Sequence, residues 1–464
     1  MHKRPIAAII LAAGKGTRMK SKKAKVLHPI GGRPMVIYTV RVAMEFGADP
    51  VVVVVGHQAG EVKEAITRNL GNQGISFALQ KEQLGTGHAV LSAKQHLRGF
   101  SGDVLILSGD VPLLTKEIIL SLHRRHIQTK ALVSVLSTQL PNPYGYGRCV
   151  VDSSGKLLRI VEEHDGSKSE KEIHEVNTGI YIVDKEFLFK ALTQVGTDNN
   201  QGEIYLTDIV RVASARDLPV YAFCTDMWQE VMGINSRAEQ ARAHDVMRRK
   251  ILNRLMETGV TILDPAVTYV EDSVTIGADT VLHPQVHLLG KTVIGRDCEI
   301  MTGTHITDSE LANDIRIFPY SVLEGAKLES GTQIGPFARL RPGAVVCKGA
   351  RIGNFVELKK AEVGENTKVM HLTYLGDAHV GKNVNVGAGT ITCNYDGVHK
   401  HTTTIEDGVF IGSDSQFVAP VLIGKNSFIG AGSTITQDVP PEALAVSRGR
   451  QLVKENWVKS KRKS

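Results

Sequence analysis

The hydrophobic pattern of the chain changes near residue 259. Before about residue 235, apolar runs of strand length alternate with segments of helix length, which predicts an α/β fold with a mostly parallel sheet. The predicted strands are residues 7–13, 51–55, 104–107, 132–136 and 179–183. After about residue 259 this alternation ends, and an aliphatic residue followed by glycine recurs at a short period.

The short period is six residues. Positions six apart carry Ile294, Ile300 and Ile306, then Ile334, Leu340, Val346, Ile352 and Leu358, then Val380 and Val386, and finally Ile411, Phe417, Ile423, Ile429 and Ile435. This period matches neither an α-helix, at about 3.6, nor a coiled coil, at about 3.5. The alternative is a β-sandwich with glycine-rich turns, but its strands recur every ~8–12 residues without a fixed phase. The period therefore predicts a solenoid of stacked coils whose aliphatic side chains point to a common axis.

A helix is predicted between the two halves. Ser236 and Glu239 have the spacing of a capping box, and Gly259 is a suitable stop. The apolar stripe of this helix is formed by Met247, Ile251 and Leu255. We therefore expect an N-terminal domain over residues 1–237, a linker helix over 238–258 and a repeat domain over 259–464.

Composition narrows the class of protein. The chain is 42% hydrophobic but only 5% aromatic, which is ordinary for a soluble globular enzyme. No apolar run approaches the ~20 residues of a membrane helix, so membrane insertion is not expected. The five cysteines are scattered without a close pair, which excludes a disulfide framework and a zinc site and favours a reducing, cytoplasmic location. A net charge of +7 suits small anionic substrates and does not by itself indicate nucleic acid.

A glycine-rich turn, residues 11–19, follows the first predicted strand. Its glycines allow backbone amides to approach a phosphate closely. The turn is neither a P-loop nor a dinucleotide fingerprint, because Met19 stands where the third glycine is required. Such a turn alone is a general α/β feature. Arg18 and Lys25 favour phosphate binding, since a triphosphate requires cations at the same edge of the sheet.

A second motif ends in Asp110, directly after the buried run 104–107. A carboxylate at the carboxyl end of a parallel strand lies where open α/β sheets bind ligands. A carboxylate together with phosphate oxygens is the usual way to hold Mg²⁺. The alternative is a helix-capping aspartate, because a helical stretch follows. The glycine-rich turn favours the metal role.

These motifs resemble those of the sugar-1-phosphate nucleotidyltransferases. The matching segments are residues 11–19, 25–28, 80–88 and 109–110. With the hexapeptide half, the whole chain resembles the bacterial bifunctional family that combines N-acetylglucosamine-1-phosphate uridyltransferase with glucosamine-1-phosphate N-acetyltransferase. The resemblance implies a Rossmann-like nucleotidyltransferase domain, a linker helix and a left-handed parallel β-helix of hexapeptide repeats.

The resemblance also implies a set of uridyltransferase residues. The nucleotide sugar would be bound by Leu11, Ala12, Ala13, Gly14, Lys25, Gln80, Gly85, Thr86, Ser108, Gly109, Asp110, Gly147, Glu163, Asn177 and Asn235. Asp110 and Asn235 would hold Mg²⁺, while Arg18 and Lys25 neutralise phosphate charge during catalysis. Ser108 departs from relatives that carry an aromatic residue there, but a backbone contact is expected at this position. We interpret His28 and His88 as scaffold residues.

In the repeat half, the pattern is interrupted at two places. Residues 368–377 put His371 beside a coil, and residues 390–397 break the period without shifting the aliphatic register on either side. Such an insertion forms a loop on the solenoid face, where functional residues concentrate. A single histidine is otherwise an ordinary surface residue. Acetylation of an amine, however, needs a general base that titrates near neutrality, which histidine supplies.

By resemblance, His371 is that base. Glucosamine-1-phosphate would be bound by Arg341, Lys359, Tyr374 and Asn385, and acetyl-CoA by Ala388, Asn394, Tyr395, Ser413, Ala431 and Arg448. The roles of Arg339 and Lys360 cannot be separated from those of solvated surface charges. Members of the family are trimers that share the acetyl site between subunits, so a homotrimer is expected.

The expected function is therefore acetyl-CoA-dependent N-acetylation of glucosamine-1-phosphate, followed by Mg²⁺-dependent uridyl transfer from UTP. One alternative is a nucleotidyltransferase whose β-helix serves only for trimerisation. His371, Lys359 and the loop with Asn394 argue against it. Another alternative is a regulatory binding protein like the nucleotidyltransferase-like subunits of translation exchange factors, which should lack the pair Lys25 and Asp110.

Overall fold

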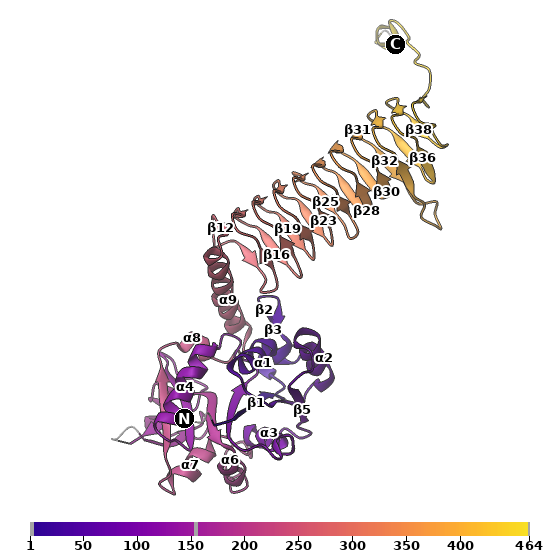
Figure 1. Cartoon of the computed structure of the whole chain (residues 1–464). Coiled ribbons are helices and arrows are strands. Elements are labelled where there is room, and N and C mark those ends of the chain that lie inside the picture. Colours follow the sequence, from indigo (N-terminus) through magenta and orange to yellow (C-terminus); the bar gives the residue numbers. More distant parts are fainter. Residues whose placement is uncertain (1–3, 153–155, 463–464) are drawn as a thin grey trace. The chain divides into compact units, whose positions relative to one another are not determined.

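A computed structural model describes residues 4–152 and 156–462. The chain divides into two compact units, residues 1–247 and 248–464, and each is described separately (Figure 1). Within the described ranges, no helix combines the length and the apolar character needed to cross a lipid bilayer.

The first unit is built around a twisted sheet that is parallel except for one central strand and one hairpin. As far as the chain is described, this sheet has nine strands, and its main path runs β11-β7-β10-β6-β1-β4-β5. The strands are β1 (Ile6–Ala12), β4 (Val51–Val55), β5 (Ile75–Leu79), β6 (Asp103–Ser108), β7 (Val133–Gln139), β8 (Arg148–Val151), β9 (Leu157–Val161), β10 (Glu175–Asp184) and β11 (Val220–Thr225). β10 pairs antiparallel with β6 and β7, and β8 pairs antiparallel with β9 and β10. The predicted strands and the mostly parallel sheet are thus confirmed.

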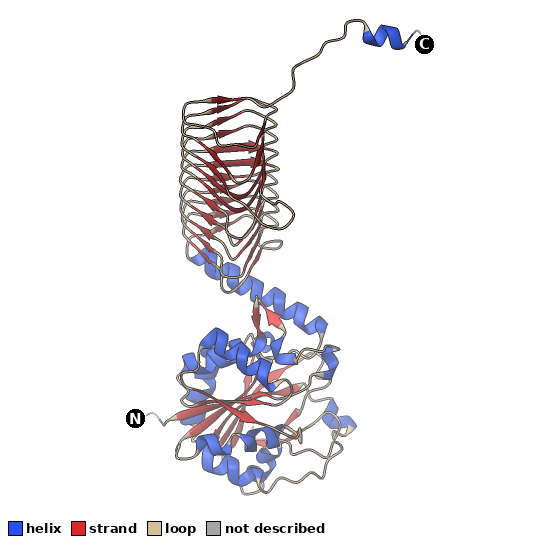
Figure 2. Cartoon of the chain, turned by 90° about the vertical axis from the view of Figure 1, so that its right-hand side faces the viewer, coloured by secondary structure: helices blue, strands red, loops and turns tan. Residues whose placement is uncertain are grey.

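Helices cover both faces of this sheet (Figure 2). One face carries α1 (Met35–Phe46), α2 (Ala59–Leu70) and α4 (Lys116–Gln128), and the other carries α3 (Thr86–Ser92), α6 (Lys185–Leu192) and α7 (Asp208–Ser214). The period-two alternation of a strand explains both cores. In β1, Ala8 and Ile10 enter one apolar cluster, whereas Ala7 and Ile9 enter the other. The short elements are η1 (Thr17–Met19), η2 (Lys25–Leu27), β2 (Pro29–Ile30), β3 (Arg33–Pro34), η3 (Lys94–Leu97), α5 (Lys168–Lys171) and α8 (Trp228–Val231).

The order of the strands determines where a ligand can bind. The chain runs from β1 outward to β4 and β5, and then returns to place β6 on the other side of β1. Leu11 at the end of β1 pairs with Ser108 at the end of β6, and Gly109 N–H donates to the Leu11 carbonyl at 2.9 Å. The loops that follow the two strands therefore leave the same edge side by side, at the switch point where open α/β sheets bind ligands.

A helix, α9 (Arg237–Glu257), contains the boundary between the two units. The predicted capping box is present: Glu239 N–H donates to Ser236 Oγ at 3.2 Å, and Ser236 N–H donates to Glu239 Oε2 at 3.0 Å. The predicted stripe is buried, with Met247, Ile251 and Leu255 at most 6% exposed. Gly259 follows the helix with φ +94°, a conformation typical of a glycine stop.

The second unit is a parallel β-helix. Within the described residues, an 11-stranded sheet comprises β12 (Thr261–Ile262), β15 (Val281–Leu282), β18 (Glu299–Ile300), β21 (Arg316–Ile317), β24 (Gln333–Ile334), β27 (Arg351–Asn354), β29 (Lys368–His371), β31 (Asn385–Val386), β34 (Phe410–Ile411), β37 (Phe428–Ile429) and β39 (Leu444–Ala445). The strands of the other sheet are β13 (Tyr269–Val270), β14 (Thr275–Ile276), β16 (His287–Leu289), β17 (Val293–Ile294), β19 (His305–Thr307), β20 (Glu310–Leu311), β22 (Val322–Glu324), β23 (Lys327–Leu328), β25 (Arg339–Leu340), β26 (Val345–Val346), β28 (Glu357–Val363), β30 (Tyr374–Val380), β32 (Ile391–Cys393), β33 (Thr403–Ile405), β35 (Gln416–Val418), β36 (Val421–Ile423) and β38 (Thr434–Ile435). A short helix, α10 (Trp457–Lys461), lies near the C-terminus.

The six-residue repeat forms the interior of this β-helix. Ile334 pairs with Ile352 on the next coil, and Ile352 pairs with Val369 on the coil after that. All residues of the predicted series are buried, none more than 5% exposed. Each coil therefore stacks its aliphatic side chains on those of its neighbours, and the predicted solenoid is confirmed.

Candidate functional site

The loop after β1 makes room for a lysine. Gly16 has φ +65°, and a Cβ atom on it would lie 2.5 Å from Lys25 Cβ. Only glycine permits this close approach and this backbone conformation. Lys25 begins η2, so its side chain is directed by a short rigid turn.

Four residues that are far apart in the sequence meet at this edge of the sheet. Lys25 Nζ forms an ion pair with Asp110 Oδ2 and donates to Asn235 Oδ1 at 3.0 Å. Arg18 Nη2 donates to the same Asn235 oxygen at 2.9 Å. The Lys25 and Asp110 side chains are only 17% and 12% exposed. The structure thus brings together both predicted metal ligands and both predicted catalytic cations.

The backbone around Asn235 is fixed by the start of α9. Asn235 N–H donates to Glu239 Oε2 at 2.6 Å, and Ile234 N–H donates to the Asp110 carbonyl at 3.0 Å. A Cβ atom on Gly233 would lie 3.2 Å from Asp110 Oδ2, so glycine keeps the space beside this carboxylate open. A carboxylate and an amide oxygen that converge on the same positive charge, here the Lys25 ammonium, also fit a small, oxygen-seeking cation such as Mg²⁺. Within the described residues, no cluster of three or more His, Cys, Asp or Glu side chains could hold a metal.

The segment 80–88 forms a loop at the N-terminus of α3. The buried Gln80 donates through Nε2 to the Gly85 carbonyl at 3.1 Å, and the same Nε2 lies 3.2 Å from His88 Nδ1. Gly85 has φ +101°, and a Cβ atom there would lie 2.6 Å from the Ile204 carbonyl oxygen. Thr86 Oγ1 accepts from Leu206 N–H at 3.0 Å. These contacts hold Gln80, Gly85 and Thr86 as one rigid unit, with His88 in contact with it.

Two residues that were not among the predicted site residues, Gln83 and Tyr146, also lie near these loops. Gln83 Nε2 donates to the Ala13 carbonyl at 2.7 Å, which ties the segment 80–88 to the glycine-rich turn. Tyr146 lies where burial, with smaller contributions from Glu239 and Asp110, raises its pKa to about 12. Tyr146 therefore remains a neutral hydroxyl close to the Asp110 charge. The only sequence signal for Gln83 was its place between the predicted contacts Gln80 and Gly85.

The predicted sugar-side residues also lie together. Asn177 N–H donates to the Gly147 carbonyl at 2.9 Å, while Asn177 Oδ1 accepts from Gly179 N–H at 2.9 Å. Glu163 Oε2 accepts from Gly145 N–H at 2.9 Å and from Arg148 Nη2 at 2.8 Å. The bond from the Gly145 backbone, assisted by Arg148, lowers the pKa of Glu163 below its ordinary value. Glu163 is thus an ionised acceptor.

In the β-helix, His371 ends β29 and pairs in register with Asn354 of β27. His371 Nδ1 lies 2.9 Å from Asn354 Oδ1, and the His371 side chain is otherwise exposed. Because the amide oxygen can only accept, this contact fits the neutral tautomer in which Nδ1 carries the proton and Nε2 keeps its lone pair. The imidazole is therefore oriented as a base whose free nitrogen is Nε2.

Positive charge also gathers in this unit, on β28 and the inserted loop. Lys359 Nζ lies 3.8 Å from Asp377 Oδ2, and Asn394 donates to the same carboxylate oxygen. The pKa of Lys359 is lowered, chiefly by contact with Lys400 of the loop, with a small contribution from Arg341. Neither Asp377 nor Lys400 was indicated by the sequence, because a lone charge on a polar loop carries no signal.

Neighbouring residues complete this face of the β-helix. Arg341 Nη1 donates to Glu357 Oε1 at 3.0 Å, and Tyr374 is the register partner of Glu357. Gly376 has no side chain, and a Cβ atom there would lie 2.4 Å from the Tyr374 hydroxyl, so this glycine is required for the ring position. Asn385 is the register partner of Lys368 on β29, one coil beyond His371.

The predicted acetyl-CoA residues follow one another along successive coils. Ala388 carbonyl accepts from Asp414 N–H at 2.7 Å, and Ser413 carbonyl accepts from Gly432 N–H at 2.8 Å. Arg448 Nη1 donates to the Ala431 carbonyl at 2.8 Å. Tyr395 bridges to Lys400 within the inserted loop. Within the described residues, no hydrogen bond or ion pair joins this row directly to His371.

Comparisons with known proteins cover both halves of the chain. The profile of the nucleotidyl transferase family matches residues 7–243, and that of the bacterial transferase hexapeptide family (six repeats) matches residues 402–437. A protein of Syntrophotalea carbinolica named "Bifunctional protein GlmU" is 54% identical over 97% of this chain and 96% of its own length. Proteins with the same name from Pelobacter propionicus and Shouchella clausii are 49% and 47% identical, over 99% and 97% of this chain and 99% and 98% of their own lengths.

A solved structure titled as UDP-glucose pyrophosphorylase complexed with UDP-glucose is also similar. It is 21% identical, has a TM-score of 0.42, and covers 53% of this chain and 100% of its own.

Proposed function

The chain belongs to the bifunctional GlmU family, and from this premise we propose which residues carry out each of its two reactions. It is a bifunctional enzyme, a uridyltransferase and an acetyltransferase. The resemblance predicted from the motifs is thereby confirmed, and the alternative of a nucleotidyltransferase with a purely structural β-helix is not favoured.

We propose that uridyl transfer takes place around Lys25, Asp110, Asn235 and Arg18. The convergence of Lys25 on Asp110 and Asn235 carries this proposal. The phosphate oxygen of N-acetylglucosamine-1-phosphate attacks the α-phosphorus of UTP, a P–O bond forms, and the bond to pyrophosphate breaks. Lys25 and Arg18 are positioned to neutralise the phosphate charge, so catalysis rests on positioning and electrostatics, without a covalent intermediate.

The nucleotidyltransferase family depends on a divalent metal ion. We propose that the ion here is Mg²⁺ and that Asp110 and Asn235 hold it, supported by their oxygen ligands and by the space that Gly233 leaves open. When bound, Mg²⁺ neutralises triphosphate charge. Lys25 Nζ contacts the same two oxygens, so its ammonium group lies where it can turn to a phosphate oxygen when the ion and substrate are bound.

For acetyl transfer, we propose His371 as the general base. The contact between His371 Nδ1 and Asn354 Oδ1 supports this role, because it leaves Nε2 to take the proton from the sugar amine. The amine nitrogen forms a bond to the acetyl carbonyl carbon, and the thiolate of coenzyme A leaves. Arg341, Lys359 and Lys400 supply positive charge for the sugar phosphate.

For the remaining binding sites, we propose the residues that the family resemblance implies. We propose that the segment 80–88 reads uracil, that Glu163 and Asn177 bind the sugar, and that the row from Ala388 to Arg448 binds acetyl-CoA. The hexapeptide repeats suggest an oligomer, and we propose a homotrimer. A cytoplasmic location is supported by the five cysteines, which all lie in the described residues and are free thiols.

A two-variant experiment tests the assignment of the residues. The full chain is mixed with glucosamine-1-phosphate, acetyl-CoA, UTP and Mg²⁺, and the products are separated. Asp110→Asn should stop at N-acetylglucosamine-1-phosphate. His371→Ala should form no acetylated product, yet make UDP-N-acetylglucosamine when supplied with N-acetylglucosamine-1-phosphate.

Matched substitutions control for nonspecific effects. Asp198→Asn and His379→Ala change exposed residues of the same two types and should leave both steps intact. Full acetylation by a folded His371→Ala protein, or full uridyl transfer by Asp110→Asn, would contradict the assignment.

A further inference from the structure

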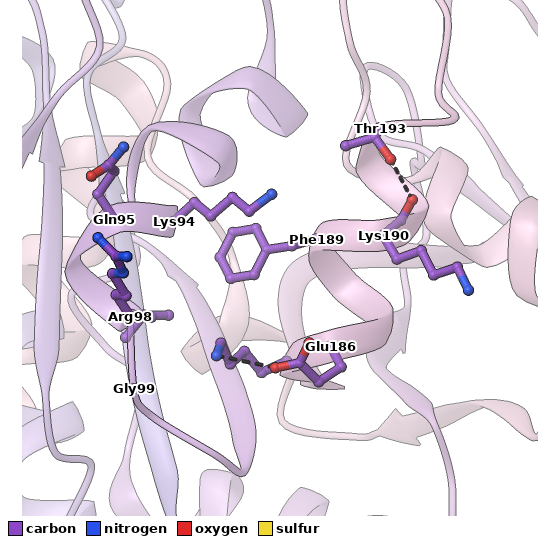
Figure 3. A pocket seen from close by; sticks show the side chains of 10 residues that line it. Lys94, Gln95, Arg98, Gly99, Glu186, Phe189, Lys190 and Thr193 are labelled. Carbon is purple, nitrogen blue, oxygen red and sulfur yellow. Dashed lines mark hydrogen bonds and ion pairs between the residues drawn. The ribbon is translucent and has the colours of Figure 1, made fainter.

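A cavity of about 500 Å³ lies on the first unit, between η3 and α6. None of the residues proposed above to bind a substrate lines it. Figure 3 shows Phe189 of α6 between the two elements, with Lys94 and Arg98 on one side and Lys190 on the other. The volume of the cavity falls within the range of small-molecule sites, about 300–1,000 Å³.

The lining of this cavity is strongly basic. Among the described residues that line it, four are cations, namely Lys94, Arg98, Lys185 and Lys190, and one is a carboxylate, Glu186. Lys185 is already satisfied, because its Nζ donates to the Phe100 carbonyl at 2.7 Å and lies 3.1 Å from Glu186 Oε1. Glu186, the carboxylate among these lining residues, is therefore already paired with Lys185.

Among the residues that the structure describes, the other three cations have no anionic partner. In the described part of the chain, Lys94, Arg98 and Lys190 form no ion pair with a carboxylate, and Lys94 Nζ instead lies 6.0 Å from the centre of the Phe189 ring. Three unpaired cations around one concavity create a positive potential that attracts polyanions. Lysine and arginine are the usual ligands of phosphoryl groups.

Part of the cavity lining is apolar. Leu97 and Phe189, which line it, are 0% and 5% exposed. A lining that combines cations with apolar side chains suits a molecule with a phosphoryl group and an organic body. We propose that this cavity is a second, separate binding site for a phosphorylated small molecule, with Lys94, Arg98 and Lys190 bound to its phosphoryl oxygens.

The cavity is separate from both proposed substrate sites, but α3 links it to the segment 80–88 of the uridyltransferase site. Lys94 of η3 follows α3 after a single residue, and α3 begins at the Gly85–Thr86 turn of the segment 80–88. α3 packs tightly on α6, since a Cβ atom on Gly87 would lie 3.1 Å from Leu192 Cδ2. The two elements that line the cavity thus flank the helix that supports the segment 80–88.

Titration calorimetry on the full chain tests the proposal. The probes are inorganic tripolyphosphate and glucose 6-phosphate, with glucose as the uncharged control. Saturating UDP-N-acetylglucosamine and coenzyme A occupy the proposed nucleotide-sugar and acetyl-CoA sites. Binding at the proposed sugar-phosphate site of the β-helix is recognised because Arg98→Glu leaves it unchanged, and it is not counted below. We expect one binding event per chain for a phosphorylated probe and none for glucose. Tighter binding of glucose 6-phosphate would identify the ligand as an organic phosphate, and binding of tripolyphosphate alone would identify it as a polyphosphate.

Two arginines provide a matched pair of variants. Arg98→Glu should weaken binding by about tenfold or more, the effect of losing one charged hydrogen bond. Arg124→Glu reverses the same charge at an exposed position of α4 outside the cavity and should leave the affinity unchanged. Lys94→Gln provides a second, milder variant in case Arg98→Glu is unstable.

Two results would overturn the proposal: no binding of either phosphorylated probe, or equal binding by wild type and Arg98→Glu. Uridyl transfer, measured in parallel, should be unchanged in Arg98→Glu. If the wild-type protein showed no uridyl transfer, that result would count against the proposed function and not against this site.

Discussion

Replacement of Asn354 separates the chemistry of His371 from its place in the fold. Asn354 Oδ1 accepts the Nδ1 proton of His371 at 2.9 Å, from the neighbouring coil, and so holds Nε2 as the proton acceptor. Asn354→Leu removes this acceptor while keeping a side chain of similar size. A neutral hydrogen bond contributes about 0.5–1.5 kcal/mol, so we expect acetyl transfer to slow by about 2–12-fold.

Asn354→Asp tests the same contact with the opposite sign. A carboxylate beside the imidazole stabilises its protonated form, so a higher pH is needed to free Nε2. An exposed ion pair contributes about 0.2–1 kcal/mol, so the acidic limb of the rate–pH profile should move upward by at most about 0.7 pH unit. At pH well above this limb, Asn354→Asp should approach the wild-type rate.

The assay is the release of coenzyme A thiol from acetyl-CoA with glucosamine-1-phosphate, followed from pH 5.5 to 9. Asn313→Asp is the control, since the Asn313 side chain accepts from Arg296 N–H at 2.9 Å and an aspartate can do the same. It adds the same charge elsewhere on the β-helix and should leave the profile unchanged. Wild-type rates and an unshifted profile in both Asn354 variants would refute the reasoning.

Three further substitutions test other parts of the structure. Gly85→Ala should destabilise the first unit by about 1–3 kcal/mol in urea unfolding, because the φ of Gly85 is +101° and a Cβ atom would lie 2.6 Å from the Ile204 carbonyl oxygen. The same substitution should raise the KM for UTP. An unchanged KM would show that this turn does not take part in nucleotide binding. Burial raises the pKa of Glu162 above its ordinary 4.5, so the folded state holds the proton more tightly and loses stability as pH rises from 4.5 through that raised value. Glu162→Gln, which can still accept from Thr207, should therefore unfold at higher urea than wild type at pH 7.5 but not at pH 4, and equal midpoints at pH 7.5 would contradict this. Ile352→Ala, at a position only 1% exposed, should cost about 2–5 kcal/mol of unfolding free energy, and a loss below about 1 kcal/mol would show that the coil collapses around the cavity.

The solenoid was predictable because one rule repeats along the sequence. A side chain that returns every six residues must point to the same axis in every coil, so the buried ladder through Ile334 and Ile352 is already visible in the spacing. The strands of the first unit were predictable for a similar reason, since a buried parallel strand is a continuous apolar run.

The contacts between coils were not predictable in the same way. Asn354 and His371 are 17 residues apart, whereas three six-residue units would give 18. A one-residue difference in coil length changes which side chains become neighbours, and the aliphatic period alone does not reveal it. Asp377 and Lys400 meet Lys359 for the same reason, across coils and across an inserted loop.

The site around Lys25 and Asp110 was predictable in part. The residue types of Lys25 and Asp110 were evident, because each follows a recognisable motif at a strand end. Their direct contact, and the shared contact with Asn235, depends on the order of the strands and on the start of α9. Tyr146 was missed because its importance lies in its burial near Asp110, which sequence spacing does not report.

The regular register of the β-helix has a consequence for its evolution. Because every coil bonds only to the coils before and after it, a whole coil can be duplicated or deleted while each remaining neighbour keeps an equivalent partner. Each such event changes the length of the column by about 4.8 Å, the spacing of adjacent strands. The distance from the first coil of the β-helix to His371 can therefore change only in steps of one coil. The geometry around the histidine is inherited unchanged in each case.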